Sequence, residues 1–236
     1  MLFCAIINEP AMVRYVFTVI AAFCICSAAA QKSDFTPPHY KKIGKAILKK
    51  ESPTYYPDLM VRYKAHDTTL SPYEYHLLYF GYALQADYEP YAHQPFADSL
   101  MAIVRKTRIS PDDYDLVIKY TGRILDKNPF DMRYLDPLIY VYRMQGKNDL
   151  ATSLEFKLGR IIETIFTTGD GLTEKTAFHV ISVSHEYDLL RALGFGYAGE
   201  QSLSRGQCDF LKVETNDFGI NGMYFNVSAL IKPGGN

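Results

Sequence analysis

The spacing of apolar residues predicts a helical region over residues 40–165. Two segments in it, 71–74 and 110–113, share one pattern: a serine that can cap a helix, a proline suited to the first turn and an acidic residue that can reach back to the cap. The stripes that follow at helical spacing are Tyr75, Leu78, Tyr79 and Tyr82 after the first, and Leu116, Val117, Tyr120 and Ile124 after the second. Each stripe lies on one helix face, so we expect these faces to be buried.

Residues 128–165 predict a helix–turn–helix hairpin that resembles a tetratricopeptide unit. Gly146 suits the left-handed position after the first helix, and Asn148 or Asp149 can cap the second. The positions that match the repeat are Leu135, Ile139 and Tyr142 on the first helix, Ala151 at the helix crossing and Pro129 at the end of the preceding unit, whereas Pro137 and Glu155 depart from it. The hairpin requires Leu135 and Ala151 to be buried.

After residue 168 the pattern changes from helical to extended. The predicted elements are a turn at 168–171, a strand at 177–184, a short helix at 186–193 ended by Gly194, a strand at 208–214, a turn at 221–222 and a strand at 223–228. This predicts a small, mainly antiparallel sheet of two or three strands that covers the last helical face. The fold class is therefore α+β, with a helical region at 31–168 and a C-terminal cap at 169–236 that together form one structural domain.

Residues 1–30 predict a secretory signal peptide. Arg14 supplies the positive charge, residues 15–26 form an uncharged apolar run, and small residues follow up to Ala30. We place cleavage after Ala30, and Met12 as the true start. The apolar run is shorter than a membrane span requires, and no later segment is long and apolar enough to be one.

Composition excludes several classes of protein. Lys+Arg number 25 and Asp+Glu 26, so the formal charge is −1, which argues against nucleic-acid binding through bulk charge. No phosphate-binding glycine loop, dinucleotide motif or nucleophile elbow occurs, and no cofactor is expected. Of four cysteines only Cys208 lies outside the leader, so the mature chain has no internal disulfide.

One group of residues in the C-terminal part has the chemistry of a metal or catalytic site. It consists of Asp170, His179, His185, Glu186 and Asp188. Imidazole and carboxylate groups are natural zinc ligands, but position 189 is Leu, so the helical zinc-peptidase spacing is missing. If residues 178–185 form one strand, His179 and His185 stand about 20 Å apart, too far to share a metal. We therefore expect no metal, and regard Cys208 paired with one of these histidines as a weaker nucleophile candidate.

Tyrosines are concentrated between residues 40 and 142. Those on the apolar stripe are expected to pack inward. Tyr73, Tyr88 and Tyr91 do not fit the stripe, which makes them candidates for a surface that binds a peptide or sugar through ring faces and hydroxyls.

Several stretches together resemble a known family. They are Asp67-Thr68-Thr69-Leu70-Ser71-Pro72, Leu78-Tyr79-Phe80-Gly81-Tyr82, Asn128-Pro129-Phe130-Asp131, Thr168-Gly169-Asp170-Gly171, Phe178-His179-Val180-Ile181, His185-Glu186-Tyr187-Asp188 and Gly222-Met223-Tyr224-Phe225-Asn226-Val227. The chain resembles the uncharacterised exported Bacteroidetes proteins classified as domain of unknown function 4919. The resemblance implies a periplasmic or outer-membrane-associated setting and brings no activity.

The sequence thus favours a non-enzymatic binding or scaffold protein of the cell envelope, with helix pairs that dock a peptide or protein partner. The alternative is an envelope hydrolase, metal-assisted or not, built from Asp170, His179, His185, Glu186 and Asp188.

Overall fold

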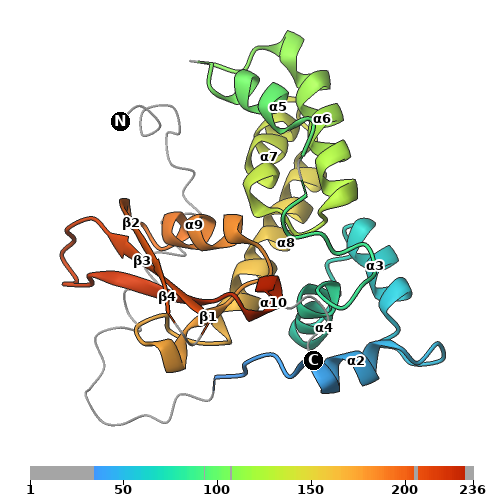
Figure 1. Ribbon diagram of the computed structural model, residues 1–236. Helices are drawn as coiled ribbons and strands as arrows, with labels where there is room; N and C mark the ends of the chain where they lie inside the picture. The colour runs from blue at the N-terminus through green and yellow to red at the C-terminus, as the bar shows by residue number, and fades with distance from the viewer. Residues whose placement is uncertain (1–34, 93, 107, 205–206, 232–236) are drawn as a thin grey trace.

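The computed structural model describes residues 35–92, 94–106, 108–204 and 207–231. The predicted leader and its cleavage point after Ala30 lie outside these residues. A helical region is followed by a small mixed sheet, which confirms the α+β class (Figure 1).

The helices follow the order of the sequence prediction but extend further toward the C-terminus. They are α2 Tyr40–Ile47, α3 Tyr56–Lys64, α4 Pro72–Tyr82, α5 Ala97–Val104, α6 Tyr114–Lys127, α7 Leu135–Met144, α8 Asn148–Phe166, α9 Val183–Ala192 and α10 Ser228–Ile231. Short 3₁₀ turns η1 Pro111–Asp113, η2 Met132–Tyr134 and η3 Glu174–Thr176 lie between them. Among the described residues, no helix combines the length and the apolar character that a membrane span needs.

Helix α4 is the centre of the larger hydrophobic cluster. The predicted stripe Tyr75, Leu78, Tyr79 and Tyr82 is buried, and Leu77 and Phe80 on other faces are buried as well. Helices α2, α3 and α8 pack around α4, so nearly its whole circumference is covered. Because every residue from Leu77 to Tyr82 is buried, the polar atoms in this part of α4 are held firmly, which matters for Tyr79 below.

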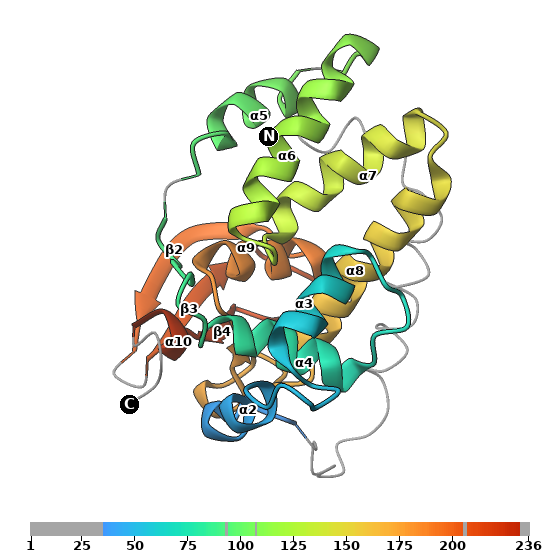
Figure 2. The same cartoon turned by 90° about the vertical axis from the view of Figure 1, so that its right-hand side faces the viewer.

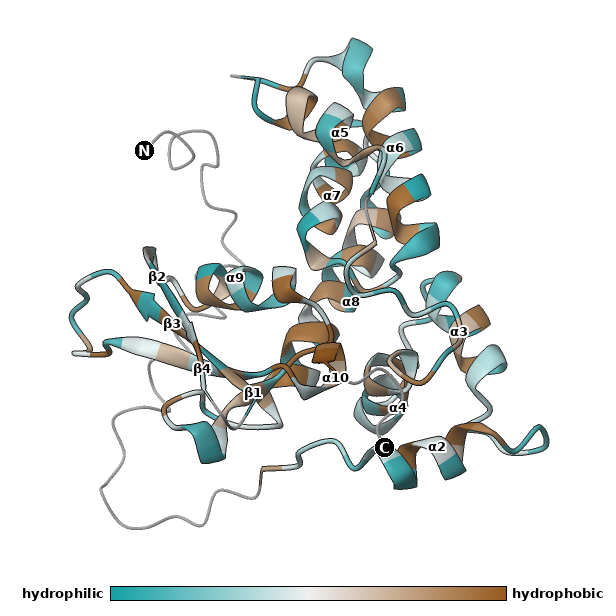
Figure 3. Ribbon diagram, viewed as in Figure 1, coloured by the Kyte–Doolittle hydropathy of each residue, from teal (hydrophilic) through white to brown (hydrophobic). Residues whose placement is uncertain are grey.

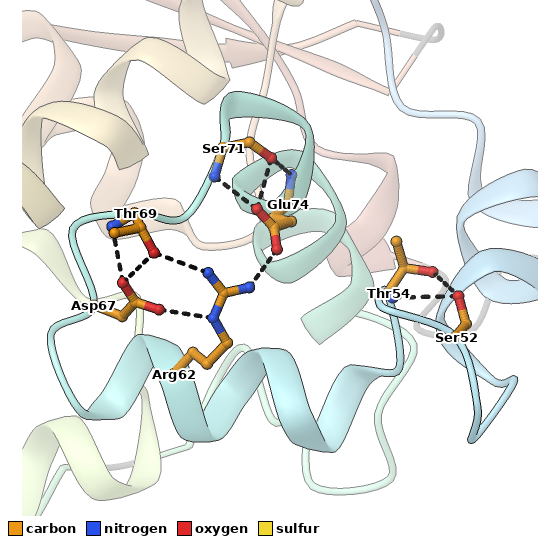
Figure 4. Close-up of polar contacts among 7 residues, drawn as sticks. All are labelled: Ser52, Thr54, Arg62, Asp67, Thr69, Ser71 and Glu74. Carbon is orange, nitrogen blue, oxygen red and sulfur yellow. Dashed lines mark hydrogen bonds and ion pairs between the residues drawn. The ribbon is translucent and has the colours of Figure 1, made fainter.

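Polar side chains from α3, from the loop that follows it and from the start of α4 fix the connection between the two helices (Figure 4). Ser71 and Glu74 form the expected capping box, in which the Glu74 backbone N–H donates to Ser71 Oγ and the Ser71 N–H donates to Glu74 Oε2. Arg62 on α3 donates to Asp67, Thr69 and Glu74. These polar residues therefore join the two helices.

Helices α5, α6 and α7, which we call the arm, extend away from the sheet (Figures 1 and 2). They enclose a second hydrophobic cluster made of Leu100, Ile103, Tyr114, Val117, Ile124, Tyr134 and Val141. Figure 3 shows apolar and polar bands on α6, as expected for a helix buried on one face. Leu116, which we placed on the buried stripe, is instead 39% exposed, because Val117 and Ile124 already fill the face toward α5 and α7.

The α7–α8 hairpin forms where the sequence predicts it. Gly146 has φ +72°, and Leu135 and Ala151 are buried, as the hairpin requires. The predicted cap is wrong: α8 begins at Asn148 itself and its N-terminus has no side-chain cap. The Asn148 side chain instead accepts a hydrogen bond from Arg143, which ties the two helices together at the turn.

The sheet has four strands, β1 Phe178–His179, β2 Tyr197–Leu203, β3 Cys208–Val213 and β4 Gly222–Asn226, in the order β1-β4-β3-β2. Strands β2, β3 and β4 are antiparallel neighbours, whereas β1 pairs with β4 in parallel. The sheet is thus mainly antiparallel, as predicted, with one strand more than expected.

Two predictions in this region are wrong. The strand expected at 177–184 keeps only Phe178–His179, because Ser182 caps helix α9 by accepting the Ser184 N–H, and the helix begins at Val183. The turn expected at 221–222 lies earlier, where Gly219 has φ +66°, and Gly222 is a strand residue packed against the Phe210 ring. The short helix ended by Gly194 is confirmed; this glycine has φ +79°.

Candidate functional site

A group of polar side chains, of which the two arginines reach the surface and the others are buried, lies where α4, η2 and α9 meet, and we call it the junction cluster. Its members are Tyr79, Asp131, Arg133, His185, Asp188 and Arg191. His185 and Asp188 lie on the same face of α9 because they are three residues apart. Asp131 directly precedes η2, so that this short turn brings a carboxylate and Arg133 toward α9.

Tyr79 makes a hydrogen bond with His185 inside the protein. The Tyr79 hydroxyl is 2.7 Å from His185 Nδ1 and accepts the Ile181 backbone N–H at 3.4 Å. If the hydroxyl donates to Nδ1, His185 is the tautomer protonated on Nε2; if it accepts from Nδ1, the proton is on Nδ1. Burial, and after it the charge of Arg133, lowers the pKa of His185 to about 3, so the ring is neutral.

The second ring nitrogen of His185, Nε2, is buried without a hydrogen-bond partner. The Phe130 backbone lies near enough to favour the charged ring, but it makes no hydrogen bond of acceptable geometry with Nε2. Asp131 Oδ1 and Asp188 Oδ2 are likewise buried without a partner. Buried polar atoms without partners are uncommon in proteins and costly to stability.

The carboxylates of the cluster have raised pKa values. Burial, followed by the nearby charge of Asp188, raises the pKa of Asp131 to about 7. Burial also raises the pKa of Asp188, while Arg133 at 3.6 Å and Arg191 at 3.3 Å oppose the shift. The cluster thus holds an exchangeable proton close to neutral pH, but Tyr79 and His185 have no exposed surface with which to meet a large substrate.

Glu186 belongs to a different environment although it is next to His185. Adjacent helix residues point about 100° apart, and Glu186 is coupled to Asp209 of the sheet rather than to the junction cluster. Its side chain is completely buried, and neither carboxyl oxygen has a hydrogen-bond partner. Burial, and secondarily Asp209, raises the pKa of Glu186 to about 8, so the side chain is mainly protonated at neutral pH.

His179 and Cys208 lie on one face of the sheet with Asn226 between them. The register pairs His179 with Asn226 and Asn226 with Cys208. Two strand spacings separate their backbones by about 10 Å, too far for the direct thiol–imidazole contact of a nucleophilic pair. Burial raises the pKa of the Cys208 thiol, which also disfavours the thiolate.

The five residues of the alternative catalytic group therefore do not converge. Asp170 is exposed in the loop before η3, where its side chain accepts the Leu172 N–H. His179 lies on β1, His185 and Asp188 face the junction cluster, and Glu186 faces the sheet. In the part of the chain that the structure describes, no three His, Cys, Asp or Glu residues are arranged to hold a metal ion.

The three candidate surface tyrosines divide into two kinds. Tyr73 and Tyr91 are 59% and 70% exposed, as expected. Tyr88 is buried, because its ring packs on Tyr82 and its hydroxyl donates to the Ile181 carbonyl at 2.7 Å. The prediction that Tyr88 lies at the surface is wrong.

The sequence did not predict which side chains surround His185 and Asp188, namely Tyr79, Asp131 and Arg133. The apolar stripe predicts only that Tyr79 is buried, and no sequence pattern marks Asp131 or Arg133 as site residues. The signal that was available is the polar content of 128–133, a segment with an asparagine, an aspartate and an arginine beside the fully buried Phe130.

The fold and its sites define an α+β protein with a buried polar junction and an exposed helical arm. The family model for "Domain of unknown function (DUF4919)" matches residues 41–233, and the chain belongs to this family. No curated protein and no solved structure matches the chain.

Proposed function

We propose that this protein is an exported binding or scaffold module of the cell envelope, non-enzymatic, that docks a protein or peptide partner on its arm. The observation that carries the proposal is the arm itself: three helices with their own buried cluster, projecting from the sheet and exposing apolar side chains. The export, the periplasmic or outer-membrane-associated setting and the tetratricopeptide-like character of the helices are parts of the proposal.

The packing of the arm supports a docking role. Helix α5 packs on α6, α6 on α7 and α7 on α8, so that helices consecutive in the chain are also neighbours in space. Arrays of this kind present extended surfaces to partners. Leu116 on α6 and Met144 at the end of α7 are 39% and 48% exposed and supply apolar contact points.

Tyr73 and Tyr91 are additional contact candidates. Exposed tyrosine rings provide apolar area with a hydroxyl at the edge, and they lose little conformational entropy on binding. The metal-assisted hydrolase is not carried forward, because its five residues lie in separate environments.

Affinity purification of tagged mature protein from envelope extracts tests the proposal. The arm variant Leu116→Glu/Met144→Lys places each charge where the helix dipole favours it and leaves the net charge unchanged. The matched control Leu172→Glu/Leu203→Lys makes the same changes at leucines that are 51% and 61% exposed outside the arm. We expect a partner that is retained by the wild type and the control and lost by the arm variant.

A partner retained equally by both variants would contradict docking on the arm. Export is tested separately by N-terminal sequencing of the protein in the envelope fraction. Export with cleavage after Ala30 gives Gln31 as the first residue, whereas a chain that still begins at Met1 contradicts it.

A further inference from the structure

Helix α2 and the loop after it carry a strongly basic surface. Residues 41–50 contain five lysines and no acidic residue, in a chain whose formal charge is −1. All five are exposed, and we call them the α2 basic face: Lys41, Lys42, Lys45, Lys49 and Lys50. In the part of the chain that the structure describes, the lysines that form ion pairs are Lys106 and Lys212, so the positive charge of the α2 basic face is not compensated.

The packing of α2 keeps this face directed outward. Ile43 and Ile47 are buried in the larger hydrophobic cluster, where α2 contacts α4. Lys41, Lys45 and Leu48 follow one another at the spacing i, i+4, i+7, and the backbone is still helical at Leu48, so they project from the opposite side of the helix. Figures 1 and 2 show α2 at the end of the molecule opposite the arm.

Leu48 places an apolar side chain among the lysines. It is 75% exposed, more than any other large apolar side chain among the described residues. The loop that follows is held against the helix, because the Thr54 hydroxyl donates to the Ala46 carbonyl at 2.8 Å and is hydrogen-bonded to the Ser52 hydroxyl (Figure 4). The leucine and the neighbouring lysines are therefore presented together at the surface.

We propose that the α2 basic face binds the surface of a lipid bilayer rich in anionic headgroups, with Leu48 reaching the boundary of the acyl chains. Clusters of roughly four to eight basic residues on an amphipathic helix are attracted to anionic lipids, and an apolar side chain beside them adds to the binding.

The kind of cation on this face favours a bilayer over an acidic protein. Every cation in the segment is a lysine, whose ammonium group acts as a point charge and lacks the fixed two-pronged geometry with which arginine holds a carboxylate. Such charges suit a surface of many mobile anionic headgroups. The inference does not rest on the proposed docking of a partner on the arm, because α2 lies at the other end of the molecule.

Flotation with lipid vesicles tests the proposal on the tagged protein as it is isolated from cells. We expect binding to vesicles of equal parts phosphatidylglycerol and phosphatidylcholine, and none to vesicles of phosphatidylcholine alone. Lys41→Gln/Lys45→Gln/Lys49→Gln should lower the partition coefficient at least about tenfold, because each lysine near an anionic surface contributes to binding. Raising the salt from about 0.1 M to about 1 M should release the wild type, since the Debye length falls from about 10 Å to about 3 Å.

Lys119→Gln/Lys127→Gln/Lys175→Gln is the matched control, because it removes three exposed lysines outside α2. It should bind the vesicles like the wild type. Glutamine suits a helix about as well as lysine does, and thermal unfolding verifies that both triple variants are folded. Any contribution of residues 1–30 is the same in every variant. Equal partition of the wild type and the α2 variant, or equal losses in the two triple variants, overturns the proposal.

Soluble polyglutamate at the same concentration of negative charge separates a bilayer from an acidic polymer. We expect weaker binding to polyglutamate, because Leu48 gains no apolar contact there. Binding of equal strength would assign the α2 basic face to an acidic chain and overturn the bilayer proposal. The α2 variant should still retain the arm's partner in affinity purification, so failure of this inference is distinguishable from failure of the proposed function.

Discussion

Tyr79 shows how one side chain can serve both the core and a polar network. Its ring packs against Phe80 and Phe130, while its hydroxyl connects the Ile181 backbone to His185. The helical stripe predicted the burial of the ring. It could not predict the hydroxyl's partner, because His185 is 106 positions away in the chain and no local pattern connects the two.

Tyr79→Phe should destabilise the protein by roughly 1–3 kcal/mol, because the substitution leaves His185 Nδ1 and the Ile181 N–H buried without their partner. Urea unfolding measures the change. Tyr73→Phe is the control, since Tyr73 is exposed, and its stability should stay within about 0.5 kcal/mol of the wild type. Equal stability of Tyr79→Phe and wild type would mean that the hydroxyl does not bridge these groups.

Glu186 gives a prediction in which pH is the variable. Its folded-state pKa of about 8 lies above the ordinary value of 4.5, so the folded chain holds this proton more tightly than the unfolded chain. The corresponding stability is fully present below about pH 4.5 and is lost as the pH rises through about 8.

Glu186→Gln removes this titration. The stability of the variant relative to wild type should therefore increase between pH 5 and pH 9, by roughly 2–4 kcal/mol. Unfolding free energies at several pH values measure it, with the exposed Glu51→Gln as control. A difference between Glu186→Gln and wild type that does not vary with pH would show that Glu186 is already ionised in the folded protein.

At the scale of elements, local signals predicted several helices and the strands β3 and β4, and failed at the two outer strands of the sheet. Capping residues and the 3.6-residue period are local, so α4 and the α7–α8 turn were found. Strand β2 was missed because it is an edge strand with almost entirely exposed residues and has no apolar alternation to detect. The strand expected at 177–184 failed because the Ser182 cap outweighs the β-branched residues beside it.

Substitutions of two glycines test whether the α7–α8 turn requires glycine at position 146. A Cβ added at Gly122, inside α6, or at Gly146, in the turn, meets no atom within 4 Å, so only backbone conformation distinguishes them. Gly122→Ala should stabilise the protein by roughly 0.5–1 kcal/mol. Gly146→Ala, at φ +72°, should destabilise it by roughly 1–2 kcal/mol. Thermal unfolding of both variants gives the comparison, and two changes of the same sign would contradict it.

At the scale of the whole molecule, the buried apolar side chains form two hydrophobic clusters. The larger cluster joins α4, α8 and the sheet, whereas the smaller one lies within the arm. Helices α5 and α6 can therefore open locally while the rest stays folded, whereas α7 is also held by Leu135 and Leu138 in the larger cluster.

Hydrogen exchange of two core variants tests this division. Leu78→Ala and Ile124→Ala each truncate a fully buried side chain and should each cost roughly 2–5 kcal/mol. Ile124→Ala should accelerate amide exchange in α5 and α6 and leave β3 and β4 protected. Leu78→Ala should accelerate exchange throughout. Uniform acceleration in both variants would mean that the chain unfolds as a single unit.

The most direct measurement of the docking proposal is photo-crosslinking in intact cells with a photoreactive amino acid at single exposed positions. The arm positions are Leu116 and Met144, and the reference positions are Leu172 and Leu203. The account predicts one discrete crosslinked species from the arm positions in the envelope fraction and none from the reference positions. Crosslinks from the reference positions alone, or from neither set, would contradict it.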